Sequence, residues 1–153
     1  MKQIFNSNNI TELLADCKDQ RITFTNGCFD LLHPGHIDYL TKAKSYGDIL
    51  IVGLNSDESV TSLKGENRPI NNQEFRAMML IGLKPVDYVV IFNEETPIEL
   101  IKKIQPTTHV KGGDYSATEL PEYEVVIASG GNVQIVPFLD GFSSTSLINK
   151  IRE

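Results

Sequence analysis

The sequence has few cysteines, no long apolar run and no excess of basic residues. Its two cysteines, Cys17 and Cys28, lack a CxxC spacing, and two thiols make no disulfide framework. A chain of 153 residues can bury about 68–70% of the surface that it exposes when unfolded, so it needs neither disulfides nor a structural metal to fold. We therefore expect a reduced, cytoplasmic setting.

The lack of long apolar segments and of basic character limits the classes of partner. The longest apolar run, residues 49–54, is too short to span a bilayer, and the N-terminus has no apolar core of a signal peptide. The net charge of −6 argues against general nucleic-acid binding, which requires a basic face. We expect neither a membrane nor nucleic acid as a partner. An acidic chain can still bind a polyanion where its few cations converge on one cleft.

What the sequence does contain is an alternation of strand and helix patterns, without an internal repeat or a linker. Continuous apolar runs typical of buried strands alternate with segments whose apolar residues follow helical spacing. Thr96 is a good N-cap, and Pro97 suits the first helical position after it. The expected strands span residues 22–25, 48–54, 86–92, 107–110 and 132–136, and the expected helices span 35–46, 55–63, 73–83, 96–105, 121–128 and 144–151.

This alternation predicts an α/β fold with a single doubly wound parallel sheet and helices on both of its faces. We expect one domain over residues 1–153, with residues 1–20 as an N-terminal helical extension. In such sheets ligands bind beyond the carboxyl ends of the strands, at the point where the strand order reverses. The chemically unusual residues of this sequence follow predicted strands, so we expect them to share one site.

The strongest candidate for that site is the segment from Asn26 to His36, directly after the first predicted strand. Pro34 suits the first turn of a helix, and Gly35 leaves its backbone accessible. His33 and His36 are three residues apart, so both imidazoles can face one side of a helix start. The free N–H groups and the dipole at such a start favour a phosphate, and two imidazoles add directed donors. The segment therefore suits a polyphosphate better than a neutral ligand.

Two other interpretations of the same residues remain open. The histidines can serve only to cap the helix, or they can bind a metal ion with Cys28 as a third ligand. Zinc usually takes three or four protein ligands, and the remaining histidine, His109, lies far along the chain.

Two further segments follow predicted strands and can reach the same site. Ser143, Ser144 and Thr145 open the last predicted helix, where they can act as N-caps or hold phosphate or purine. The segment from Lys111 to Asp114 contains two glycines that can simply form a turn. Alternatively, Lys111 reaches an anion, while Asp114 accepts sugar hydroxyls or helps to position a metal.

Residues 25–36 resemble the signature of the cytidylyltransferase-like nucleotidyltransferases, whose mark is His-x-Gly-His, met here at His33, Gly35 and His36. Later segments narrow the resemblance, which covers nearly the whole chain from about Arg21 onward. Together they look like the branch that adenylylates D-glycero-D-manno-heptose 1-phosphate on the route to ADP-heptose. These segments are Asn55-Ser56-Asp57, Lys64-Gly65 with Arg68-Pro69, Val110 to Tyr115, and Asp140 to Thr145. The family usually has Ser-Thr-Thr in the last segment, so Ser144 is a departure that keeps a hydroxyl.

The resemblance implies a Rossmann-like nucleotidyltransferase fold and transfer of AMP from ATP to a sugar 1-phosphate, with release of pyrophosphate. It implies that Mg²⁺ is bound through the phosphates, without fixed protein ligands. The product would serve lipopolysaccharide or surface carbohydrate synthesis. The resemblance also raises Lys64 and Arg76 as triphosphate contacts, although Lys64 can be merely solvated and Arg76 can pair with Glu74 on its helix.

The motifs and the resemblance together assign three groups of residues. The catalytic group is His33, His36, Lys64 and Arg76. The nucleotide-binding group is Asn26, Gly27, Cys28, Phe29, Gly35, Lys111, Gly112, Ser143, Ser144 and Thr145. The group that binds the acceptor is Asp30, Asn55, Arg68 and Asp114.

Other functions remain open at this stage. Enzymes of the same family can transfer CMP from CTP to glycerol 3-phosphate, or make FAD or a coenzyme A precursor. From a different class, the chain can be a nucleotide-binding regulatory module without catalysis. A homodimer is possible by analogy with the family. In the heptose pathway this activity is sometimes fused to a kinase, which we expect here as a separate protein.

Overall fold

The computed structural model describes residues 3–153, so residues 1 and 2 of the expected N-terminal extension lie outside the described residues. Its centre is a six-stranded sheet with the order β1-β4-β3-β2-β5-β6, in which every neighbouring pair is parallel. The strand order reverses at β2, because β3 and β4 follow on one side of it and β5 and β6 on the other. The strands are β1 (Ile4–Asn6), β2 (Ile22–Gly27), β3 (Ile49–Asn55), β4 (Tyr88–Phe92), β5 (Thr108–Gly112) and β6 (Asn132–Val136).

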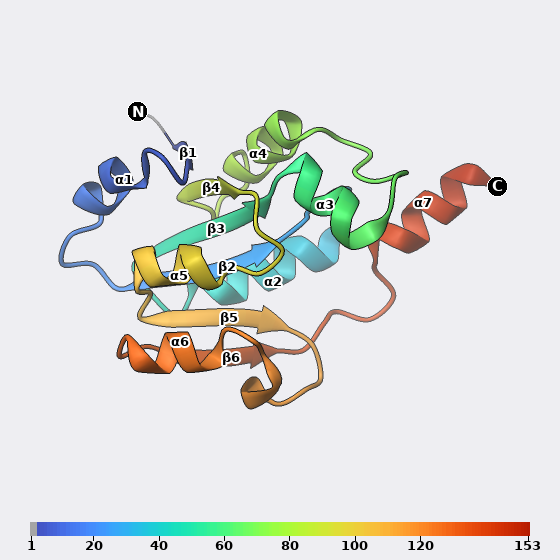
Figure 1. The fold of residues 1–153 in the computed structure, drawn as a ribbon. Coiled ribbons are helices and arrows are strands. Elements are labelled where there is room, and N and C mark those ends of the chain that lie inside the picture. Colours follow the sequence, from blue (N-terminus) through green and yellow to red (C-terminus); the bar gives the residue numbers. More distant parts are fainter. Residues whose placement is uncertain (1–2) are drawn as a thin grey trace.

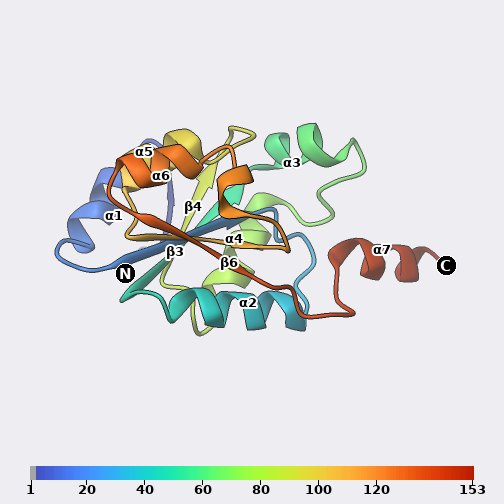
Figure 2. The ribbon, with the colours of Figure 1, turned by 90° about the horizontal axis from the view of Figure 1, so that it is seen from below.

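Helices cover both faces of this sheet (Figures 1 and 2). One face carries α2 (Pro34–Lys44) and α4 (Gln73–Ile81), and the other carries α1 (Ile10–Asp16), α5 (Ile98–Ile104) and α6 (Tyr123–Ala128). α3 (Asp57–Lys64) follows β3, a short 3₁₀ helix (Ala117–Glu119) precedes α6, and α7 (Ser144–Arg152) extends past the carboxyl ends of the strands. The predicted doubly wound α/β fold is confirmed. None of the helices in residues 3–153 is long and apolar enough to cross a membrane.

The uninterrupted apolar run of β3 follows from its burial on both sides. Ile49 and Ile51 belong to the core cluster under α1, α5 and α6, whereas Leu50, Val52 and Leu54 belong to the cluster under α2 and α4. All five side chains are buried. Since successive side chains of a strand point to opposite faces, a strand between two apolar layers needs apolar residues at every position.

The N-terminal segment differs from the expected helical extension, because it also adds a strand to the sheet. β1 pairs with β4, with Ile4 opposite Val89, and α1 then buries Leu13 in the core. A strand of three residues carries too little periodicity to be recognised in a sequence. Its position depends on the edge of β4, which offers unpaired backbone groups.

The predicted start of the helix at residues 96–105 is wrong by one residue. α5 begins at Ile98, so Thr96 is not its N-cap and Pro97 occupies the cap position. The Pro97 carbonyl accepts a hydrogen bond from Ile101 N at 2.8 Å, which opens the helix without a side-chain cap. Proline suits this position because it has no N–H that would need a partner.

The sheet opens where its strand order reverses. β2 pairs with β3 along six residues, but it pairs with β5 only at Thr23–Thr108 and Phe24–His109. Beyond these pairs, residues 25–27 of β2 and 110–112 of β5 are not paired with each other. This leaves a crevice at the carboxyl ends of the two central strands, where a ligand site is expected.

Candidate active site

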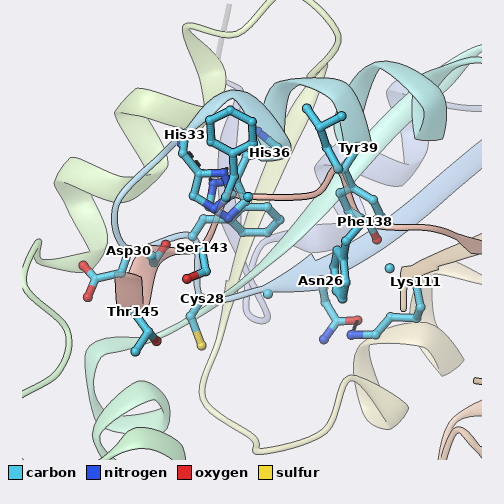
Figure 3. Close-up of a pocket in the computed structure, with 18 of the residues that line it drawn as sticks. Asn26, Cys28, Asp30, His33, His36, Tyr39, Lys111, Phe138, Ser143 and Thr145 are labelled. Carbon is cyan, nitrogen blue, oxygen red and sulfur yellow. Dashed lines mark hydrogen bonds between the residues drawn. The ribbon is translucent and has the colours of Figure 1, made fainter. Parts of the chain in front are cut away.

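A cavity of about 620 Å³ lies at this crevice (Figure 3). Its size falls in the range of roughly 300–1,000 Å³ that small-molecule sites occupy. Its walls come from five parts of the chain: the end of β2 with the loop after it, the first half of α2, the end of α3 with the loop after it, the end of β5 with the loop after it, and residues 138–145. The predicted site residues that line it are Asn26, Gly27, Cys28, Phe29, Asp30, His33, Gly35, His36, Lys64, Arg68, Lys111, Gly112, Ser143, Ser144 and Thr145.

Both histidines of the His-x-Gly-His motif cap the start of α2. His33 is the N-cap residue, and its Nδ1 accepts a hydrogen bond from Gly35 N at 3.1 Å. The Nδ1 of His36 accepts in turn from His33 N at 3.2 Å, which completes a reciprocal capping box. The two rings stack with their centroids 3.9 Å apart. Both histidines therefore cap the helix, and the Nε2 atom of each ring is free of capping contacts.

These contacts determine where each imidazole carries its proton. Burial lowers the pKa of His33, and burial together with His33 lowers the pKa of His36 to about 4, so both rings are neutral near pH 7. A neutral imidazole has one N–H, and a nitrogen that accepts a hydrogen bond cannot carry it. The proton therefore lies on Nε2 in both rings. The cavity thus receives two neutral N–H donors from the start of one helix.

A metal centre built on these histidines lacks the necessary third ligand. Burial raises the pKa of the Cys28 thiol, so the thiol is protonated at neutral pH when no metal ion is bound. In the part of the chain that the structure describes, no group of three or more His, Cys, Asp or Glu side chains could hold a metal ion.

The start of α7 meets the histidines from a distant part of the sequence. Ser143 is its N-cap and accepts from Ser146 N at 2.9 Å, while Ser144 Oγ donates to Leu31 O in the loop before α2 at 2.8 Å. The Phe142 ring stacks on His33, with centroids 6.0 Å apart. A Cβ on Gly35 would lie 2.8 Å from the His33 ring, so only glycine lets these parts meet.

The turn between β2 and α2 is held in an uncommon backbone conformation. Phe29 has a φ of 47°, in the left-handed region that residues with a side chain rarely adopt. Its ring is buried and lies 5.3 Å from the ring of His36. The packing of the Phe29 ring therefore offsets the cost of this backbone conformation, about 1–3 kcal/mol. Backbone conformations of this kind are common at binding sites.

Cations reach the cavity from two sides. Lys111, at the end of β5, is partly buried, and burial lowers the pKa of its ammonium. Within residues 3–153 that ammonium has one hydrogen-bond partner, Asn26 Oδ1 at 3.5 Å, so it retains donors for an anion. Lys64 and Arg68 line the opposite side, at the end of α3 and in the loop after it. The acidic chain thus gathers three of its cations around one cavity.

Asp30 organises the loop that carries Arg68. Its carboxylate is buried and accepts from Arg68 Nε at 2.8 Å, Ile70 N at 2.8 Å and Asn71 N at 2.9 Å. Burial alone would raise the pKa of Asp30, but the two backbone amides and the guanidinium keep it below its ordinary value. The carboxylate is 0% exposed, and these three donors occupy most of its acceptor positions. Asp30 therefore positions Arg68 and does not present a free acceptor to a substrate hydroxyl.

Arg76 is a structural anchor and does not line the cavity. Its side chain is fully buried, Nε donates to Asn71 O at 2.9 Å, and Nη1 donates to Cys28 O at 2.7 Å and Asn55 O at 2.8 Å. Nη2 donates to Asp57 Oδ1 at 2.8 Å. Because four of its five N–H groups are bound by the protein, the geometry does not support the predicted contact with a triphosphate.

Two other predicted residues also lie outside the cavity lining. Asn55 is buried, and its Nδ2 donates to Ser59 Oγ at 2.9 Å. Asp114 is exposed and does not line the cavity. Both follow predicted strands, which placed them at the correct end of the sheet. The strand pattern does not show which way a side chain turns after the strand ends.

The three groups assigned from the sequence omit seven cavity residues: Tyr39, Tyr115, Phe138, Leu139, Asp140, Gly141 and Phe142. Tyr39 lies one helical turn after His36, and Phe138 with Leu139 follows the last strand, so the same positional rules could have found them. Phe138 covers Gly112, where a Cβ would come within 2.5 Å of its ring. Figure 3 shows Tyr39, Phe138, Asn26 and Lys111 at one end of the cavity, with His33, Ser143 and Thr145 toward the other.

A family model described as Cytidylyltransferase-like matches residues 24–149. The match spans more than half of the chain, which therefore belongs to this family. The predicted class, a nucleotidyltransferase, is confirmed.

Two relatives of similar sequence are longer than this chain. "Bifunctional protein HldE" of Campylobacter curvus (strain 525.92) is 50% identical over 151 residues, which are 99% of this chain and 31% of that protein. The protein of the same name from Rhodopseudomonas palustris (strain BisB5) is 56% identical over 133 residues, 87% of this chain and 27% of that protein. The chain therefore spans less than a third of these relatives.

Solved structures share the fold. A lipopolysaccharide core biosynthesis protein from Thermoplasma volcanium GSS1 superposes with a TM-score of 0.62 at 28% identity and covers 78% of this chain and 97% of its own. A pantoate-beta-alanine ligase from Francisella tularensis has a TM-score of 0.58 at 17% identity, covers 97% of this chain and 77% of its own, and is similar in fold alone.

Protonation of His36 is expected to destabilise the fold. Its pKa is about 4 in the folded protein, against an ordinary value of 6.5, so the unfolded chain binds the proton first as the pH falls. The free energy of unfolding should therefore drop between about pH 6.5 and pH 4. In the variant His36→Gln the side chain can still cap the helix but does not titrate, so the drop should be smaller. Urea denaturation across this range measures both proteins, and equal pH dependence would contradict the expectation.

Proposed function

We propose that residues 1–153 form one nucleotidyltransferase domain that transfers AMP from ATP to D-glycero-D-manno-heptose 1-phosphate, giving ADP-heptose and pyrophosphate. One observation carries the proposal: two neutral Nε2–H donors and the start of α7 converge on a cavity that also receives Lys64, Arg68 and Lys111. Such a set of donors and cations suits a triphosphate beside a second phosphate. The name of the Thermoplasma protein, which refers to lipopolysaccharide core biosynthesis, supports a carbohydrate acceptor.

The proposed reaction needs no general base. An oxygen of the sugar phosphate attacks the α-phosphorus, the bond from that phosphorus to the bridging oxygen breaks, and pyrophosphate leaves with the electron pair. The second pKa of a phosphate monoester is about 6, so the nucleophile is already ionised at neutral pH. The main obstacles are repulsion between anions and the charge that develops on the phosphates. Positioning and preorganised donors therefore supply most of the catalysis.

The residues of the cavity take distinct parts in this proposal. The Nε2–H groups of His33 and His36 donate to the α-phosphate and the departing pyrophosphate, and the backbone at the start of α7 binds the nucleotide. Lys64 and Lys111 neutralise phosphate oxygens, and Arg68 binds the acceptor phosphate from the loop that Asp30 holds. Arg76 acts only through the backbone that it anchors.

Magnesium enters this scheme as part of the substrate, bound to ATP. Mg²⁺ prefers oxygen ligands and keeps several waters, usually with one or two carboxylates. The carboxylates that line the cavity are Asp30, which is already bound to Arg68 and two amides, and Asp140. These residues fit an ion held mainly by phosphate oxygens and water, with Asp140 as the available carboxylate.

A cytoplasmic location suits an enzyme that consumes ATP and carries two free thiols.

Pyrophosphate release tests the function. We expect release with ATP and the heptose 1-phosphate, and little with CTP or with glycerol 3-phosphate. Release with CTP and glycerol 3-phosphate alone would instead favour a cytidylyltransferase. Tight nucleotide binding without release from any acceptor would favour a regulatory module.

The role of the histidines has its own test. His36→Ala should lower kcat about 100–1,000-fold, because it removes one preorganised donor to the developing charge. Loss of the cap should cost only about 1 kcal/mol of unfolding free energy. Asp38→Ala, which breaks an exposed ion pair with Lys42 on the same helix, is the matched control and should keep normal turnover. Ordinary turnover in His36→Ala would rule out the proposed role.

We further propose that the chain forms a homodimer through α4. The outer side of this helix exposes Phe75 (59%), Met78 (67%) and Met79 (58%), while Ala77 and Leu80 pack inward. Three large apolar side chains on adjacent turns form a patch typical of an interaction surface. The occupant that we propose is the same patch of a second copy.

Charge and space on this patch favour two antiparallel copies of α4. Glu74 lies at one end of the helix and Lys84 just beyond the other, both are exposed, and neither forms an ion pair within residues 3–153. In an antiparallel pair centred between Met78 and Met79, Glu74 of one copy lies about one residue from Lys84 of the other. Phe75 then lies opposite Gly82, which has no side chain to obstruct the ring. A twofold contact of this kind is self-complementary.

Light scattering after size exclusion measures the assembly state. The protein should elute as a dimer and Met78→Glu as a monomer, because a buried unpaired charge opposes association. Ile127→Glu, at an exposed residue of α6, is the control and should remain dimeric. Glu74→Lys should weaken the dimer, and Glu74→Lys with Lys84→Glu should restore it. A monomeric protein, or a dimer indifferent to Met78→Glu, would contradict the proposal.

A further inference from the structure

The crevice between β2 and β5 is bridged from one face of the sheet by a single side chain. The ladder between the two strands ends at Phe24–His109, and the next residues are Thr25 on β2 and Val110 on β5. Tyr39, on α2, places its hydroxyl between them. It donates to Val110 O at 2.8 Å and is hydrogen-bonded to Thr25 Oγ1. A side-chain hydroxyl thus joins two strands at the position where their own backbone pairing has stopped.

The hydrogen atoms of this bridge have one consistent arrangement. Burial raises the pKa of the Tyr39 hydroxyl, so it remains protonated at neutral pH. Its one proton goes to Val110 O, which can only accept, and its oxygen therefore accepts from the hydroxyl of Thr25. Thr25 is fully buried, so no water replaces either contact from that side. Removing the tyrosine hydroxyl would leave two buried polar groups without this partner.

The opposite face of the same gap carries a second, weaker bridge. Because side chains alternate along a strand, Asn26 and Lys111 point away from Tyr39, and their side chains meet with Nζ 3.5 Å from Oδ1. Both line the cavity, as does Tyr39 itself. Each is the neighbour, one residue further along its strand, of a group that Tyr39 binds. Tyr39 therefore joins the backbone segments that carry these two side chains.

We infer that Tyr39 is a positioning residue for Lys111, holding β2 and β5 at the separation that directs the ammonium toward a bound phosphate. The inference rests on the proposed function and deepens it. Tyr39 lies one turn after His36 on α2, so one helix aligns the imidazole donors at one end of the cavity and the ammonium at the other. The triphosphate would then contact the imidazoles at one end of the cavity and the Lys111 ammonium at the other. Tyr39 would not touch the reacting atoms.

The experiment compares Tyr39→Phe with Lys111→Met and with the double variant. We expect Tyr39→Phe to raise the KM for ATP and the Kd for ATP with Mg²⁺ about five- to tenfold, with kcat nearly unchanged, because a binding contact is weakened equally in ground and transition states. In the Lys111→Met background the same change should have little further effect, since the group that it positions is gone. Tyr46→Phe, an exposed tyrosine beyond the end of α2, is the control. Thr25→Ser should keep normal KM, and Thr25→Val should resemble Tyr39→Phe.

The KM and Kd for ATP distinguish a positioning role of Tyr39 from a purely structural one. A structural role predicts a lower melting temperature and fewer active molecules, but an unchanged KM and Kd for those that remain. Unchanged KM and Kd in Tyr39→Phe, or full additivity with Lys111→Met, would overturn the inference. Titration calorimetry measures Kd without catalysis. If ATP binds but no acceptor releases pyrophosphate, the proposed transfer fails while the Tyr39 comparison still stands.

Discussion

The hydrogen bonds that close the start of α2 are the constraint on which the site depends. Each imidazole uses Nδ1 to accept a backbone N–H of the helix start, so each must carry its proton on Nε2. Burial keeps both rings neutral, which removes the repulsion that two stacked imidazolium ions would experience. A capping requirement of the helix and a donor requirement of phosphate chemistry are thereby met by the same two side chains.

The loop before this helix connects the remaining parts of the site. Arg76 binds the carbonyl of Cys28, Asp30 binds the amides of Ile70 and Asn71, and Ser144 binds the carbonyl of Leu31. Three segments, α4, the polar loop before it and α7, are thus fixed to the four consecutive residues 28–31, of which 28–30 form part of the cavity wall. Two of the side chains that make these contacts, Asp30 and Arg76, are buried and charged. Each forms several hydrogen bonds, which offset the cost of burying its charge.

Much of this arrangement could be predicted from the sequence, for identifiable reasons. Apolar runs and helical spacing gave the sheet and its helices, and the rule for the carboxyl ends of strands brought together residues as distant as His36 and Thr145. The anchoring role of Arg76 could not be predicted, because its partners are mainly backbone carbonyls up to 48 residues away, and these leave no pattern in the sequence. The same is true of Phe138, whose placement over Gly112 depends on how the chain turns after β6. Strand β1 was missed because three residues show no periodicity.

Nitrogen NMR of isotope-labelled histidine tests the central claim most directly, because it reports which ring nitrogen of each imidazole carries the proton. We expect His33 and His36 at pH 7 to be neutral, with Nδ1 unprotonated and Nε2 protonated, and we expect both Nε2 signals to shift when a non-hydrolysable ATP analogue binds. Protonated Nδ1 atoms, or Nε2 signals that do not respond to the nucleotide, would contradict it.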